Sequence, residues 1–172
     1  MPHNSYSFDD FKMDVYAFNE IAGKDTAATY LDLCKQFALI TEELKETADG
    51  LNENNPVEVL DGVVDVLVTS LGLLQKLEAL GFNTQKALYK TAVNNLSKYP
   101  NSEQIAMLTA QKFEADNVNV TVTYNSNYDL FVIKDDQDKV RKPVNFVSNN
   151  LDDCVPMFVL SNGFEGYPKH AD

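Results

Sequence analysis

Residues 40–68 read ITEELKETADGLNENNPVEVLDGVVDVLV, and this stretch decides the fold. It contains two runs with helical spacing, separated by the polar connection at residues 52–55. The acids of the two runs are Glu42, Glu43 and Glu46 in the first and Glu58, Asp61 and Asp65 in the second. The stretch therefore predicts two consecutive helices that both carry carboxylates.

The apolar pattern extends each of these helices outward. Apolar residues spaced three and four apart predict a helix over residues 26–49, with Gly50 as its end. Pro56 is a typical first-turn residue, so the next helix is predicted over residues 56–80. This second helix is apolar nearly all round, which predicts that it is buried on most of its sides.

The rest of the chain completes a mainly α fold. The same spacing predicts helices over residues 8–22 and 84–98 and a short helix capped by Ser102. After Asn117 the apolar period changes to two, which predicts strands over residues 118–124, 130–134 and 140–144 before an irregular tail. We therefore expect a helical bundle with a small C-terminal β-hairpin appendage, organised as a helical catalytic domain over 1–117 and a small extension over 118–172 packed on it.

Composition and charge exclude several classes of function. The chain has 172 residues, enough for one domain with a core, and a net charge of −12, which repels nucleic acid polymers and anionic membranes. No run of 18 apolar residues and no signal peptide are visible, so a cytoplasmic protein is expected. Cys34 and Cys154 are too far apart in sequence for a metal or redox motif, and His3 and His170 provide almost no material for a zinc site.

The spacing of the acids places them on shared helix faces. Residues three or four apart lie on one face, so Glu43 and Glu46 point the same way, as do Glu58, Asp61 and Asp65. The first set alone also fits a solvated surface helix. The two aspartates, however, lie among valines and leucines, and no Lys or Arg occurs between residues 45 and 76. A desolvated carboxylate is costly unless it is paired or bound to a cation, so these acids indicate a metal site.

The ligand chemistry indicates which metal and which substrate to expect. Oxygen ligands without His or Cys select hard divalent cations, here Mg²⁺ or Mn²⁺. Because Mg²⁺ favours few carboxylates together with substrate phosphates, a phosphate-bearing substrate is expected. Asn95 and Lys98, near the end of the helix predicted over 84–98, fit either an ordinary polar helix end or a pair that holds a polyphosphate.

These residues resemble the all-α nucleoside triphosphate pyrophosphohydrolases, the superfamily of MazG, dimeric dUTPases and phosphoribosyl-ATP pyrophosphatase. The family's marks are EExxE on one helix and ExxD on the next, which Glu42-Glu43-x-x-Glu46 and Glu58-x-x-Asp61 match. Asp65-Val66-Leu67-Val68 matches the apolar context of the family's aspartate, with Asp61 four residues upstream. The chain looks closest to the phage and bacterial MazG-like branch. The segments that carry this resemblance are Leu80-Gly81-Phe82, Asn95-Leu96-Ser97-Lys98 and Asp138-Lys139-Val140-Arg141-Lys142-Pro143.

The resemblance covers about residues 8–148 and implies cleavage of a nucleotide between its α and β phosphates. A (d)NTP would give the (d)NMP and pyrophosphate, in the host cytoplasm if the protein is phage-encoded. The implied metal ligands are Glu43, Glu46 and Asp65 with Asp61 or Glu58. Glu43 or Glu42 would accept the proton of the attacking water. Asn95 and Lys98 would hold the phosphates, and Asn19 would contact the base. The appendage, with Lys139 and Lys142, would cover the site or aid assembly.

Two alternatives stay open at this point. One is a phosphoribosyl-ATP pyrophosphatase on the same fold. The other is a non-catalytic helical protein that binds a divalent cation for assembly. In either case the apolar helix over 56–80 needs cover on most of its circumference, which predicts a homodimer or homotetramer.

Overall fold

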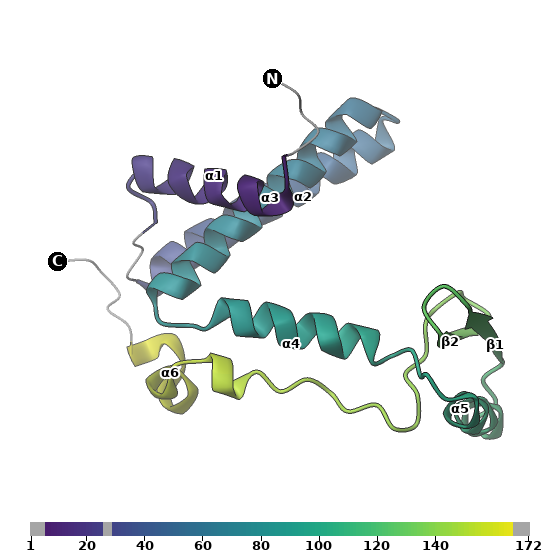
Figure 1. The fold of residues 1–172 in the computed structure, drawn as a ribbon. Coiled ribbons are helices and arrows are strands. Elements are labelled where there is room, and N and C mark those ends of the chain that lie inside the picture. The colour runs from purple at the N-terminus through teal and green to yellow at the C-terminus, as the bar shows by residue number, and fades with distance from the viewer. Residues whose placement is uncertain (1–5, 26–28, 167–172) are drawn as a thin grey trace. The chain divides into compact units, whose positions relative to one another are not determined.

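The computed structural model describes residues 6–25 and 29–166, and within them the chain forms mostly helices and one two-stranded antiparallel sheet. The predicted class, mainly α with a small β-hairpin near the C-terminal end, is confirmed. The chain divides into two compact units. The first contains the residues up to Thr84 together with the segment from Asp152 onward, and the second contains Gln85–Leu151. Figure 1 labels the elements of both.

Local capping explains where the three longest helices of the first unit begin. These are α1 (Phe8–Ile21), α2 (Tyr30–Asn52) and α3 (Pro56–Ala79). Ser7 forms a capping box before α1, the Thr29 side chain accepts a backbone N–H of α2, and the Asn55 side chain accepts two backbone N–H groups of α3. Residues 26–28, where the sequence predicts the start of α2, lie outside the described residues.

Helices α2 and α3 lie side by side in opposite directions (Figure 1), and two glycines allow their backbones to approach closely. A Cβ on Gly62 would lie 2.5 Å from Oγ1 of Thr47 and 3.1 Å from its Cα. A Cβ on Gly50 would lie 3.0 Å from Cβ of Glu58. The prediction that Gly50 ends α2 is wrong, because the helix continues to Asn52 and buries this glycine against α3.

The apolar core of the first unit joins these helices to the end of the chain. Leu33 of α2, Leu80 and Val159 are buried together. Val159 belongs to α6 (Met157–Asn162), which lies between the short 3-10 helices η2 (Asp152–Cys154) and η3 (Gly163–Gly166). The segment predicted to be irregular is therefore partly helical.

The second unit is built from two helices and the hairpin. Its elements are α4 (Thr84–Leu96), α5 (Glu103–Ala115), β1 (Val120–Asn125) and β2 (Leu130–Asp135), and the strands pair antiparallel from Val120↔Asp135 to Asn125↔Leu130. Ile133 and Thr109 are completely buried, and the Thr109 Oγ1 accepts the backbone N–H of Val144 at 3.1 Å. The predicted third strand over 140–144 reduces to one isolated bridge, Lys134↔Val140.

Burial along α3 differs from the prediction. Toward its C-terminal end Leu71 and Gly72 are buried, but Val57 is 73% exposed and Leu60 is 67% exposed. The expectation of burial on most sides is therefore wrong for a single chain, because the other described helices cover only one side of the first half of α3. Among the described helices, none is long and apolar enough to cross a membrane.

Candidate functional site

Most of the predicted acids of the first unit act on the charge of Glu43, which lies on the face of α2 that packs against α3. Glu43 is half-buried, and its pKa is raised, mainly because burial disfavours the charged carboxylate. The negative charges of nearby acids raise it further, in the order Asp65, Glu46, Glu42 and Asp61. Four acids from two helices therefore repel the same carboxylate.

The register of the helix pair explains this gathering. Because α2 and α3 run in opposite directions and touch at Thr47 and Gly62, the turn that precedes Thr47 faces the turn that follows Gly62. Glu43 lies one turn before Thr47, and Asp65 lies about one turn after Gly62. The glycine contact therefore aligns the EExxE segment with the aspartates of α3.

The predicted metal ligands differ in their exposure and position. Asp65 is half-buried like Glu43, whereas Glu46 and Asp61 are exposed. Glu58 is exposed too, and it packs by its Cβ against Gly50, farther along the pair. Glu58 is also absent from the acids whose charge raises the pKa of Glu43. Of the two candidates for the remaining ligand, Asp61 is thus the one associated with Glu43.

The described carboxylates near Glu43 do not form a compact set of metal ligands. Across residues 6–25 and 29–166, no group of three or more His, Cys, Asp or Glu side chains has the arrangement of a formed metal site. The donor set nevertheless consists only of carboxylate oxygens, the ligand type that Mg²⁺ and Mn²⁺ prefer.

A polar network that sequence reasoning missed links α1, α2 and α3. The Nδ2 of Asn19 donates to Oε1 of Gln75 at 2.9 Å, and the Nε2 of Gln75 donates to the backbone carbonyl of Tyr16 at 3.2 Å. The Nε2 of Gln36 donates to the carbonyl of Thr69 at 2.9 Å. Asn19, predicted to contact a base, thus has a partner on α3. The available signal was a pair of glutamines interrupting the apolar faces of α2 and α3.

Asn95 and Lys98, predicted to hold phosphate, belong to the second unit. The Nζ of Lys98 donates to Oδ1 of Asn95 at 2.8 Å, so the two side chains act as one polar group at the end of α4. They line a cavity of about 370 Å³ together with Lys139 and Lys142 of the segment that follows the hairpin.

Comparisons of the chain with protein-family models, with curated proteins and with solved structures give no match.

Proposed function

We propose that the chain is a metal-dependent nucleoside triphosphate pyrophosphohydrolase, which converts a (d)NTP into the (d)NMP and pyrophosphate. The observation that carries this proposal is the convergence of acid charges from α2 and α3 on the half-buried Glu43. Such a cluster is unfavourable in the absence of a cation, and its oxygen-only donors suit Mg²⁺ or Mn²⁺. The motif order described above adds support from the sequence.

The residues that would hold the metal are Glu43, Glu46, Asp61 and Asp65, with Glu58 as an outer alternative to Asp61. A bound divalent cation supplies neutralisation of the phosphate oxygens when the nucleotide is present. Because Mg²⁺ usually keeps water and substrate oxygens among its ligands, a loosely arranged set of carboxylates is compatible with this role.

Glu43 is the preferred proton acceptor, with Glu42 as its alternative. In the proposed reaction a water oxygen bonds to the α-phosphorus, and the bond from this phosphorus to the oxygen bridging to the β-phosphorus breaks. Pyrophosphate leaves with the bonding electron pair, and the proton of the water goes to the carboxylate. Glu43 is half-buried on the α3-facing side of α2, whereas Glu42 is exposed, which favours Glu43.

A second copy of the chain is the expected partner. The exposed apolar side chains of α2 and α3 include Phe37, Leu44, Leu51, Val57, Leu60, Val63, Val64 and Leu67. We call this set the open apolar face. A small domain rarely leaves so many large apolar residues of two adjoining helices in water, so a homodimer or homotetramer built on them is the proposed assembly. The open apolar face also favours the alternative of a non-catalytic, cation-binding assembly protein.

A substrate panel tests the activity and separates the alternatives. The full chain is incubated with each NTP and dNTP, and with phosphoribosyl-ATP, in the presence of Mg²⁺, and the products are separated by anion exchange. Monophosphate from at least one NTP or dNTP, lost on addition of EDTA, is expected. Turnover of phosphoribosyl-ATP alone would assign the histidine-pathway activity. Absence of turnover, together with stabilisation by Mg²⁺, would assign the non-catalytic role.

A further inference from the structure

A cavity of about 370 Å³ in the second unit gathers three lysines in a chain whose net charge is −12. Its polar lining consists of Asn95, Lys98, Lys139 and Lys142, and Leu96, Tyr99 and Val140 complete it. The volume lies within the range typical of small-molecule sites. All these residues belong to Gln85–Leu151, so the cavity is a property of one unit.

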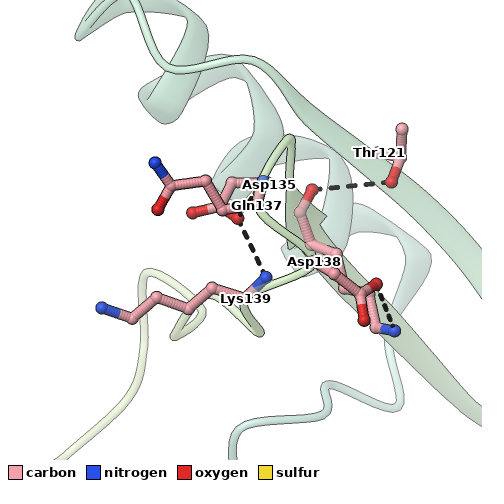
Figure 2. Close-up of polar contacts among 6 residues, drawn as sticks. Thr121, Asp135, Gln137, Asp138 and Lys139 are labelled. Atoms are coloured by element: carbon pink, nitrogen blue, oxygen red, sulfur yellow. Dashed lines mark hydrogen bonds and ion pairs between the residues drawn. The ribbon is translucent and has the colours of Figure 1, made fainter.

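The backbone that carries Lys139 is fixed by the end of the hairpin. Oδ1 of Asp135 accepts the backbone N–H groups of Gln137 and Lys139, each at 2.9 Å. The Asp135 N–H donates to the carbonyl of Lys139 at 3.1 Å, and Asp138 adopts the left-handed conformation that the tight turn requires, with φ 61°. The Lys139 side chain is left outside these contacts and extends away from Asp138 (Figure 2).

Lys142 is positioned by the same segment. The Arg141 N–H donates to the carbonyl of Ile133 at 2.8 Å, which fastens the chain beside β2 one residue before Lys142. The Nζ of Lys142 lies 4.7 Å from the centre of the Phe146 ring. Both lysines are exposed, so a ligand can reach their ammonium groups.

The acids of the hairpin are already engaged elsewhere. Asp135 pairs with Arg141, Asp138 pairs with Lys134 at 2.7 Å, and Asp136 accepts from Asn119 at 3.1 Å. In the part of the chain that the structure describes, Lys98, Lys139 and Lys142 form no ion pair with an acid. Like charges gathered around one cavity are unfavourable in the absence of an anion, and lysine ammonium groups bind phosphate as point charges.

We infer that Lys139 and Lys142 form, with Asn95 and Lys98, a binding site for a polyphosphate chain. The binding of a nucleotide substrate by Asn95 and Lys98 rests on the proposed function. The binding of an anion in the cavity does not depend on it. The polyphosphate has two possible sources, the triphosphate of a nucleotide or free pyrophosphate, and both present the same oxygens to the lysines.

Calorimetry of the full chain in EDTA, with inorganic tripolyphosphate as the probe, tests the site. Lys139→Gln and Lys142→Gln are each expected to weaken binding about tenfold or more, the effect of removing one charge-assisted contact. Lys139→Arg keeps the charge and should bind within about threefold of the parent chain. Lys112→Gln is the matched control, because it removes one exposed charge from α5 outside the cavity. Circular dichroism of each variant checks that the fold is retained.

The outcomes separate this inference from the proposed function. Equal binding by the parent chain and both glutamine variants, or the same loss in the Lys112 control, would overturn the site. Variant-dependent binding of tripolyphosphate by a chain that hydrolyses no nucleotide would keep the site and reject the pyrophosphohydrolase. Nucleotide hydrolysis with an unchanged KM in both glutamine variants, together with unchanged tripolyphosphate binding, would reject the site and keep the pyrophosphohydrolase. Repeating the titration with a nucleoside triphosphate and with pyrophosphate identifies the source.

Discussion

Gly62 of α3 lies directly against Thr47 of α2, so close that a Cβ on the glycine would come within 2.5 Å of the threonine Oγ1 and 3.1 Å of its Cα. This contact fixes the distance and the register of the two helices. The acids one turn away on each helix consequently repel one another, and this repulsion contributes to the raised pKa of Glu43. A backbone contact between two uncharged residues thus organises the proposed metal site.

Gly62→Ala should destabilise the fold and disturb the acid cluster. The added methyl meets the backbone of Thr47, which cannot move as a side-chain end does, and overpacking of this kind costs about 1–3 kcal/mol. Urea unfolding followed by circular dichroism measures the change. In Gly62→Ala with Thr47→Ala, only the contact with Oγ1 is relieved, so recovery should be partial. An increase in stability, of the size that helix propensity alone gives, would refute the close packing.

Asp65→Asn and Glu46→Gln should each abolish turnover without unfolding the chain. Each change removes one negative charge from the proposed ligand set and weakens metal binding, and it also relieves repulsion of Glu43 in the metal-free protein. The metal-free variants should therefore unfold at the same or a higher temperature than the parent chain. Asp49→Asn is the control, an exposed acid of α2 that is not among those acting on Glu43. Near-normal rates in both variants would reject the ligand assignment.

Glu58→Gln should have a milder effect than Asp61→Asn. Asp61 contributes to the charge around Glu43, whereas Glu58 packs against Gly50 farther along the helix pair. Steady-state rates over a series of Mg²⁺ concentrations compare the two variants. Complete loss of activity in Glu58→Gln with full activity in Asp61→Asn would assign the ligand role to Glu58.

The open apolar face should be covered by a second copy of the chain. Light scattering at micromolar concentration is expected to give two or four times the chain mass of 19.3 kDa. Val63 and Leu67 are 46% and 41% exposed, so neither belongs to the core of the single chain. The double substitution Val63→Lys with Leu67→Lys should therefore reduce the assembly to monomers that remain folded. A parent chain that scatters as a 19.3 kDa particle would contradict the proposed oligomer.

The hairpin end should lose stability at low pH through Asp135. The pKa of Asp135 is lowered, first by the backbone N–H of Lys139 and further by Gln137 and Arg141. A lowered pKa means that the unfolded chain binds the proton more readily. The stabilisation is therefore fully present above the ordinary value of 3.8 and is lost as the pH falls through the folded-state pKa. Thermal unfolding of Asp135→Asn between pH 2 and 7 should show a smaller acid-dependent loss than the parent chain, with Asp136→Asn as the control.

Local signals account for what could be predicted from the sequence. Asn55 and Pro56 determine the start of α3 through the first turn alone, and the alternation around Val122 indicates a strand without reference to the rest of the chain. The prediction for Gly50 is wrong because a glycine after a helical run also fits a stop signal. Its actual role, the close approach of α3, depends on a partner that no local pattern reveals.

The features of the candidate site that lie within one helix could be predicted from the sequence, whereas the contacts between helices could not. The spacing of Glu43 and Glu46, and of Asp61 and Asp65, follows from helical periodicity, so the two acidic faces could be predicted. The effect of the Asp65 charge on Glu43 depends on the register between the helices, which the contact at Gly62 determines. The hydrogen bond from Asn19 to Gln75 joins residues 56 positions apart in sequence. It could not be predicted either, because it also depends on how the helices pack.

Cleavage between the α and β phosphates is tested most directly by ³¹P NMR of a nucleotide incubated with the full chain and Mg²⁺. The resonances of the monophosphate and of pyrophosphate should appear together at equal rates, and EDTA should abolish both. Release of a diphosphate with free phosphate, or a spectrum that stays unchanged for every NTP and dNTP, would contradict the proposed function.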